Sequence, residues 1–399
     1  MNGKRYKWYI YELVKNITIA YVSEASPNDK HAWSGTVHYV YKTLLDTGYT
    51  VHALGPRSPA FLKFFLATFN KISLTLFRKR LDYRHSIVYS KAYGRIFNRQ
   101  LKKIFYDVVV VCGNTECGAF IQSERPVIYV LDRTIAGALN YHTILTSLWP
   151  FSQNQSLFTD QKAMLESRKI FFSSQWAADH AHRYYGINPK KIIVQPFGAN
   201  LDKIPSREEA LVHPMPDHMK LLLVGTYWHN KGADIAFNTM VILREKGINA
   251  SLTVVGCEPP GNISHPHLRI IPFVDKNSPS GIRQLWELFK SHHFFILPTR
   301  FDCTPIVFCE ASAFALPILS ADTGGVRGHI TEGVNGFLIP YEDKGPAYAQ
   351  KISSVMADTR YYHSLRVSAR DHYEKQLNWQ AWGGAFAAEV SQEILNNRR

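Results

Sequence analysis

Cysteine is scarce in this sequence of 399 residues. The five cysteines are an odd number and include no Cys-x-x-Cys pair, which argues against a disulfide framework and against a zinc site. None of them has a neighbouring histidine in the sequence that would activate a thiol nucleophile. We therefore expect each to be a small buried apolar side chain. The five are Cys112, Cys117, Cys257, Cys303 and Cys309.

Long hydrophobic runs are lacking as well. A helix that crosses a bilayer needs about 20 apolar residues, and lysine, arginine, asparagine or glycine interrupts every candidate stretch. The basic N-terminal stretch contains Glu12 and has no small-residue cleavage site, so it does not read as a signal peptide. These absences predict a cytoplasmic protein that reaches the inner face of the cytoplasmic membrane only as a peripheral protein.

Acidic residues are nearly absent from residues 57–103. Twelve lysines and arginines stand against Asp82 alone, so this segment carries +11 of the net charge of +14. Phenylalanine and leucine are interleaved with the basic residues, a composition that favours contact with an anionic membrane surface. One alternative is a solvated charged face over an ordinary core helix. Nucleic acid is the less favoured alternative, because no helix-turn-helix or RNA-binding aromatic signature is found.

The length and the apolar pattern predict two α/β domains. A chain of 399 residues exceeds one ordinary core. Apolar runs of strand length alternate with helical patterns in residues 17–194 and again from residue 220, which predicts two doubly wound, largely parallel sheets. A helix is predicted at residues 161–168. Residues 198–218 contain three prolines and are expected to form a linker. The predicted domains are residues 1–204 and 205–375, and the helix of residues 376–399 is expected to pack back on the first.

Two carboxylates, Asp302 and Glu310, lie eight positions apart in a predicted strand-loop-helix unit. Open α/β sheets bind ligands at the carboxyl ends of their strands, and a helix start at that edge favours a phosphate. We therefore expect the two side chains to hold hydroxyls of a sugar and of a ribose. The alternative is a helix N-cap at Asp302 and a surface residue at Glu310.

Lys231 and Gly232 stand at a predicted helix start, after a loop that begins at Gly225. A lysine there can reach a diphosphate held near the helix N-terminus. Neutralising the departing diphosphate is the main electrostatic task when a glycosyl bond to phosphate breaks. The alternative is a surface lysine followed by a capping glycine.

This order of motifs resembles that of the retaining glycosyltransferases of family 4, or glycosyltransferases group 1. The family has the GT-B fold, in which two Rossmann-like domains face a central cleft. The resemblance rests on five motifs, which are Gly225 with Lys231-Gly232, Val254-Val255-Gly256, Asp302 with Glu310, Gly324-Gly325, and Glu332-Gly333-Val334-Asn335-Gly336-Phe337.

The resemblance implies roles by position. Glu310 would bind the ribose, Asp302 the donor sugar and Lys231 the diphosphate, while Asp132 would position or deprotonate the acceptor. Backbone amides of residues 304–307 would hold the phosphate and sugar, and residues 272–274 would line the base pocket. The catalytic residues are then Asp132, Lys231 and Asp302, and the donor site comprises Gly35, Gly225, Thr226, Lys231, Pro272, Phe273, Val274, Asp302, Thr304, Pro305, Ile306, Val307 and Glu310.

Two positions depart from the family pattern. Thr226 stands where the family commonly has arginine, so one of two expected cations on the diphosphate is missing, and Arg300, His229 or a backbone amide would have to compensate. Asp302 replaces a glutamate and is one methylene shorter, which would tune the donor sugar that fits.

The predicted function is that of a retaining hexosyl- or related glycosyltransferase. It would move a sugar from a UDP- or GDP-sugar to a membrane-associated glycan or lipid-linked acceptor in cell-surface polysaccharide synthesis. No cofactor or metal is expected, because no Asp-x-Asp pair follows a strand, and Lys231 with helix dipoles would replace a metal. The alternatives are a soluble acceptor, such as a protein or modified nucleic acid, and a noncatalytic GT-B relative that binds a nucleotide.

Overall fold

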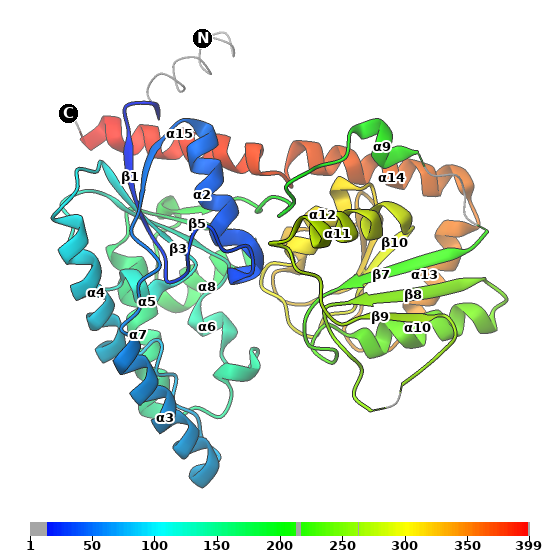
Figure 1. Cartoon of the computed structure of the whole chain (residues 1–399), viewed down its shortest axis with the longest axis horizontal. Helices are drawn as coiled ribbons and strands as arrows, with labels where there is room; N and C mark the ends of the chain where they lie inside the picture. The colour runs from blue at the N-terminus through cyan, green and yellow to red at the C-terminus, as the bar shows by residue number, and fades with distance from the viewer. Residues whose placement is uncertain (1–13, 213–216, 262, 398–399) are drawn as a thin grey trace. The chain divides into compact units, whose positions relative to one another are not determined.

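The computed structural model describes residues 14–212, 217–261 and 263–397 (Figure 1). The chain forms two compact units, one of residues 1–195 with 382–399 and the other of residues 196–381. The first unit therefore includes the C-terminal helix from residue 382 onward. The N-terminal stretch, which is not expected to be a signal peptide, lies largely outside the described residues.

The first unit is built on a six-stranded parallel sheet in the order β2-β1-β3-β4-β5-β6. The chain leaves β1 toward β2 on one side and resumes at β3 on the other, so the switch point of the sheet lies between β1 and β3. The strands are β1 (Thr18–Val22), β2 (Thr50–Ala53), β3 (Val108–Cys112), β4 (Val127–Leu131), β5 (Lys169–Phe172) and β6 (Ile192–Val194).

Helices cover both faces of this sheet. Side chains of α4, α7 and α8 pack with alternate strand residues such as Val109 and Phe172 in one apolar cluster. Phe171 faces the other way, and its ring lies 5.9 Å from that of Trp382 in α15. The helices are α2 (Thr36–Thr47), α3 (Ala60–Phe77), α4 (Ile87–Leu101), α5 (Thr115–Gly118), α6 (Ile135–Ala138), α7 (Pro150–Glu166), α8 (Gln175–Tyr185) and α15 (Trp379–Asn397).

The second unit repeats the plan, with six parallel strands in the order β12-β11-β10-β7-β8-β9. Its switch point lies between β7 and β10. The strands are β7 (Met219–Val224), β8 (Ala250–Val255), β9 (Leu268–Ile271), β10 (Phe294–Leu297), β11 (Ile318–Ala321) and β12 (Gly336–Ile339), and the helices are α9 (Arg207–Leu211), α10 (Ala233–Glu245), α11 (Pro279–Ser291), α12 (Ile306–Ala313), α13 (Pro346–Met356) and α14 (Thr359–Lys375). The predicted fold class, with two doubly wound α/β sheets, is confirmed.

Two local predictions need correction. The expected linker contains α9, because Ser206 and Glu209 form a capping box that starts a helix within it. Helix α7 begins at Pro150, whereas the sequence pattern indicated a start at residue 161. The buried positions of its first turns are polar, among them Ser152, Ser156 and Thr159, so no apolar period marks this part of the helix.

The expectation that no apolar stretch is long enough to cross a membrane is also wrong. Helix α3 has 18 residues and a mean hydropathy of 1.3, which suffice by length and composition alone. Only 6% of it is buried in the protein. Lys63 and Lys71 interrupt the apolar run in the sequence. The mean hydropathy of the helix nevertheless stays high enough for a membrane-crossing helix.

A buried histidine makes the second unit sensitive to acid. His292, after α11, lies with Nε2 3.0 Å from Thr253 Oγ1. Burial lowers the pKa of His292 to about 4 from its usual 6.5. Between these values the unfolded chain binds more protons, so stability rises with pH and is lost as pH falls through that window.

We therefore expect the free energy of unfolding to fall by about 2 kcal/mol through His292 between about pH 7 and pH 5. Urea unfolding at both pH values, compared between the wild type and His292→Gln, measures the contribution. An unchanged pH dependence in His292→Gln would contradict it.

Candidate functional site

The loops at the switch point of the second unit carry the predicted donor residues. The β7–α10 loop begins at Gly225 and ends at Lys231, and the β10–α12 loop carries Asp302. Both leave the carboxyl ends of adjacent parallel strands, so both lie at one edge of the sheet. The sequence pattern therefore located this edge correctly.

Glycine allows the two loops to meet. Gly232 has a φ of +70°, and an added Cβ would lie 2.0 Å from the carbonyl oxygen of Pro298. A Cβ at Gly225 would lie 2.9 Å from Lys231 Cγ. A larger residue at either position would displace the β10–α12 loop or the lysine side chain.

Lys231 and Asp302 form an ion pair in this edge. Lys231 Nζ donates to Asp302 Oδ2 at 2.6 Å, and the Thr304 amide donates to Asp302 Oδ1 at 3.1 Å. Asp302 is buried, while Lys231 keeps 22% of its side-chain surface exposed. Asp302 is not the helix N-cap, because α12 begins at Ile306 with Pro305 as its N-cap, so the bond from the Thr304 amide is a local turn ahead of the helix.

Glu310, in α12, is fully buried. Lys276 Nζ, from the β9–α11 loop, lies 3.3 Å from Oε1, whereas Oε2 has no hydrogen-bond partner in the described part of the chain. Burial raises the pKa of Glu310, and the lysine opposes that shift. The alternative of a surface glutamate is wrong. A buried carboxylate with an unused oxygen costs stability, which is typical of a residue kept for a ligand.

Lys276 is a residue that the sequence reasoning missed. It follows the predicted base-pocket residues, but no motif marked it. Of those, Pro272 and Phe273 are exposed and Val274 is half-buried. The β9–α11 loop thus supplies both an exposed aromatic ring and a cation beside Glu310.

Arg300 was one candidate to replace the arginine missing at Thr226. Its guanidinium instead donates to both carboxylate oxygens of Asp234, at 2.8 and 2.7 Å, and to the carbonyl oxygen of His229. The hydrogen bond to Asp234 raises the pKa of Arg300 further. Thr226 itself is exposed. Arg300 therefore braces the β7–α10 loop against α10.

The remaining donor positions lie around the start of α12. Thr304 and Val307 are half-buried, and Pro305 and Ile306 are buried. Pro305 is the N-cap residue of this helix. Helix α12 begins at Ile306, shortly after Asp302. The backbone of the helix start and the carboxylate of the ion pair therefore lie in one stretch of chain.

The carboxyl edge of the first sheet carries Gly35, after β1, and Asp132, after β4. Trp33, Ser34 and Gly35 have φ values of 49°, 57° and 94°, a run of left-handed backbone that is costly for the first two residues. Trp33 Nε1 donates to Asp132 Oδ2 at 2.9 Å, and Asp132 is buried. Sequence reasoning missed Trp33, although its place beside Gly35 in the first loop is a signal that could have found it.

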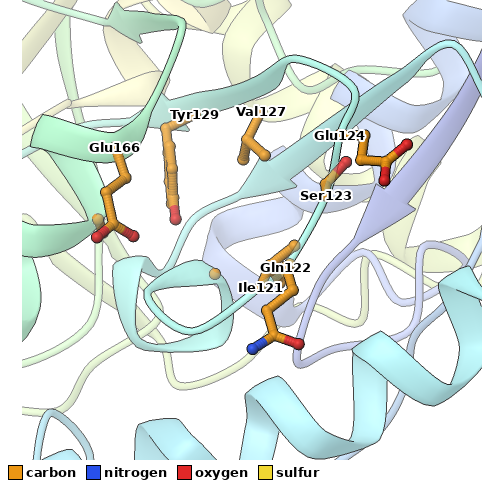
Figure 2. Close-up of a pocket in the computed structure, with 9 residues that line it drawn as sticks. Ile121, Gln122, Ser123, Glu124, Val127, Tyr129 and Glu166 are labelled. Carbon is orange, nitrogen blue, oxygen red and sulfur yellow. The ribbon is translucent and has the colours of Figure 1, made fainter.

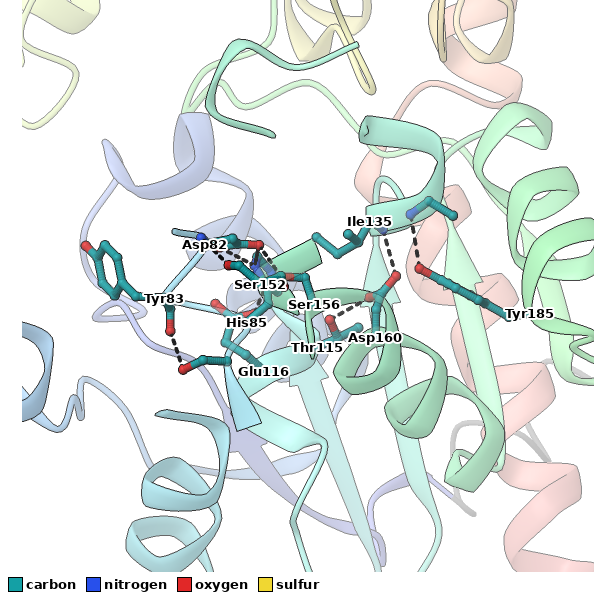
Figure 3. A network of polar contacts seen from close by, with 12 residues as sticks. Asp82, Tyr83, His85, Thr115, Glu116, Ile135, Ser152, Ser156, Asp160 and Tyr185 are labelled. Carbon is teal, nitrogen blue, oxygen red and sulfur yellow. Dashed lines mark hydrogen bonds and ion pairs between the residues drawn. The ribbon is translucent and has the colours of Figure 1, made fainter. Parts of the chain in front are cut away.

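The first unit also contains a buried polar network (Figure 3). His85 lies 2.9 Å from Asp82 Oδ2 and 3.3 Å from Glu116 Oε2, and Ser156 donates to Asp82 at 2.8 Å. Burial alone would lower the pKa of His85, but the two carboxylates raise it well above its usual value. Through His85 the network ties the segment after α3 to α5 and α7.

Asp160 belongs to the same region of Figure 3 and supports the β4–α6 loop. It accepts hydrogen bonds at 2.7 Å from the Thr115 hydroxyl and from the Ile135 amide. Because Asp132 begins this loop, Asp160 fixes the backbone that carries it.

A separate cavity of about 480 Å³ lies in the first unit (Figure 2). It contains none of the predicted site residues, and Val127 at its wall begins β4, so it lies toward the amino end of that strand. Figure 2 places Tyr129 and Glu166 at one side and Glu124 at the other. The cavity is therefore distinct from the ligand edge of the sheet.

The five cysteines are buried. Burial raises the pKa of Cys257 to about 11 and that of Cys112 to about 12. They are apolar thiols, as expected. The described part of the chain contains no cluster of three or more histidine, cysteine, aspartate or glutamate side chains that could hold a metal ion.

Comparison with known proteins identifies the second unit. The model of the family "Glycosyl transferases group 1" matches residues 218–358, which include Lys231, Asp302 and Glu310. Over this segment the chain is similar to the glycosyl transferases group 1, and the resemblance inferred from the motifs is confirmed there.

Curated relatives that the chain matches are glycosyltransferases by name. A D-inositol 3-phosphate glycosyltransferase from Jonesia denitrificans is 21% identical over 255 residues, which are 55% of this chain and 56% of the relative. The chain spans about half the length of the curated relatives that it matches.

Two solved structures have the same fold. Sucrose-phosphate synthase from Thermosynechococcus elongatus is similar with a TM-score of 0.66 and 17% identity, covering 96% of this chain and 100% of that protein. HepE from Anabaena, in complex with UDP and glucose, is similar with a TM-score of 0.57 and 14% identity, covering 94% and 99%. The predicted GT-B fold class is confirmed.

Proposed function

We propose that the protein is a retaining glycosyltransferase that takes a sugar from a UDP- or GDP-sugar. The observation that carries the proposal is Glu310, whose Oε2 is buried without a partner at the ligand edge of the second sheet. An oxygen so placed can accept hydrogen bonds from ribose hydroxyls. HepE from Anabaena, a protein of the same fold, was solved in complex with UDP and glucose, which supports a nucleotide-sugar donor for this chain.

The ion pair of Lys231 and Asp302 fits the diphosphate end of the donor. Lys231 can exchange Asp302 for a diphosphate, which is more highly charged and a stronger partner. Asp302 Oδ2, once released by the lysine, can accept a hydrogen bond from the donor sugar. Lys231 neutralises the charge that grows on the diphosphate as its bond to the anomeric carbon breaks, and no metal is needed for that task.

Asp132 is the proposed acceptor residue. It would position the acceptor hydroxyl or take its proton while that oxygen bonds to the anomeric carbon. Retention requires attack from the face that the diphosphate leaves. The side chain of Trp33 orients Asp132 through the indole hydrogen bond. The proposed acceptor is a glycan or a lipid-linked sugar at the cytoplasmic face of a membrane, where cell-surface polysaccharide is made, and the basic segment of residues 57–103 supports it.

Thermal unfolding with UDP, GDP and a panel of their sugars tests the donor, followed by an assay for sugar transfer or hydrolysis. We expect one nucleotide family to raise Tm and its sugar to be turned over. Failure of every nucleotide would contradict the proposal. Stabilisation without turnover of any sugar would instead favour a noncatalytic nucleotide-binding relative.

Substitution of Lys276 tests how much its ion pair with Glu310 stabilises the free protein. Lys276→Met leaves Glu310 buried without a counter-ion, which costs stability, commonly about 3 kcal/mol or more. We expect Tm to fall, and to recover in the double variant Lys276→Met/Glu310→Gln. A stable single variant would show that the pair is not needed in the free protein.

A further inference from the structure

Helix α3 has one face that packs on the first unit. Leu62 and Leu66 contact the apolar cluster of that unit. Farther along, the Trp149 indole donates to Ser73 Oγ at 2.8 Å, and Asn70 Oδ1 accepts from the Leu81 amide at 2.7 Å. These contacts extend from the first turn to the last, so the helix has a fixed orientation on the unit.

The opposite face of α3 is apolar and exposed. Phe61, Phe64 and Leu76 keep 86%, 75% and 68% of their surface exposed. Their spacing places them on one side of the helix, together with further large apolar residues. In Figure 1 the far end of α3 lies beyond the other elements of its unit. The α3 outer face comprises Phe61, Phe64, Phe65, Phe69, Ile72 and Leu76, all of them exposed.

The exposed charges in α3 and just after it are positive. Lys71, Arg78, Lys79 and Arg84 are exposed in and after the helix. Asp82, the single acidic residue of residues 57–103, is engaged with His85 inside the protein and adds little negative potential outside. An exposed apolar strip flanked by cations matches the interface of an anionic bilayer, where acyl chains lie beneath negative head groups.

We propose that α3 lies in the plane of an anionic membrane surface, with the α3 outer face inserted at the level of the head groups. The proposal deepens the proposed function and rests on it only for the identity of the acceptor. A membrane-crossing α3 would break the contacts of Asn70 and Ser73 and the ion pair of Lys63 with Glu24, and would carry Lys63 into hydrocarbon. The amphipathic division of the helix therefore favours lying on the membrane over crossing it.

A second copy of the chain is the competing occupant of this face. A symmetric dimer through α3 would bring two segments of +11 together with no exposed acidic residue in either to offset them. Charge repulsion thus disfavours the dimer, whereas the same charges strengthen contact with anionic lipid.

Co-sedimentation of the full-length protein with vesicles tests the proposal. One set is phosphatidylcholine alone and the other includes phosphatidylglycerol. The variant Phe61→Ser/Phe64→Ser/Leu76→Ser removes the apolar strip, and Phe105→Ser/Val212→Ser is the matched control, because both residues are exposed apolar side chains outside α3. Circular dichroism and Tm verify that each variant is folded.

We expect the wild type and the control to bind the anionic vesicles, more weakly at high salt, and the α3 variant to lose about tenfold or more in affinity. Equal binding by the α3 variant, or no preference of the wild type for anionic vesicles, would overturn the proposal. If the wild type did not bind vesicles but formed a dimer that the α3 substitutions dissociate, the proposal would be wrong, and a second copy of the chain would be the partner of this face. The assay contains no nucleotide, so a lack of vesicle binding would not contradict the proposed nucleotide-sugar site.

Discussion

Lys231→Met is expected to lower kcat for sugar transfer about 100- to 1,000-fold, with a much smaller change in KM. Lys231 lies at the switch point with its ammonium 2.6 Å from Asp302 and part of its surface exposed to a ligand. The charge on the departing diphosphate is greatest in the transition state, so a cation placed there acts mainly on kcat. Steady-state kinetics with the donor identified by thermal unfolding measures both constants.

The control for this prediction is Lys246→Met, which removes an exposed lysine at the end of α10 in the same unit. It should leave kcat unchanged. If Lys231→Met retained full kcat, or raised KM alone, then Lys231 would serve the uniform binding of the donor and the proposed electrostatic role would be wrong.

Glu310→Gln is expected to weaken nucleotide binding about 100-fold while leaving the free protein at least as stable as the wild type. The loss of affinity follows from two charge-assisted hydrogen bonds to ribose, each worth about 1.5–3 kcal/mol. The free variant is expected to stay stable because burial raises the pKa of the Glu310 carboxyl, so the ionised carboxylate destabilises the wild type. An acid with a raised pKa in the folded state loses stability as pH rises above its unfolded value, and glutamine removes that cost.

This opposite response of binding and stability separates a ligand residue from a structural one. Calorimetric titration gives the affinity, and Tm without nucleotide gives the stability. Glu287→Gln, at an exposed position of α11, is the matched control and should change neither. A lower Tm with normal affinity in Glu310→Gln would assign Glu310 to the core of the unit.

The second unit was largely predictable from its sequence. Its strands are buried on both faces and read as short apolar runs, and the glycines and the lysine mark the loop after β7. The proximity of Lys231 to Asp302, 71 positions apart, followed from the rule that parallel strands carry their loops to one edge. Their direct ion pair was not predicted, because periodicity gives no side-chain geometry.

The missed residues share a physical cause. Lys276 and Trp33 act through long side chains from loops, where no hydrophobic period or spacing rule applies. The start of α7 was missed because its buried face carries polar side chains that serve the network around His85 and Asp160. Helix α3 was misjudged as interrupted, since its lysines lie beside the apolar strip and its Asn70 is turned toward the protein.

The proposed function requires that a nucleotide diphosphate binds between the β7–α10 loop, the start of α12 and Glu310. Calorimetric titration of the wild type, Lys231→Met and Glu310→Gln with UDP and with GDP tests this most directly. The account predicts that one nucleotide binds the wild type and that both variants bind it at least about tenfold more weakly. Equal affinity in all three proteins, or no binding of either nucleotide to the wild type, would contradict it.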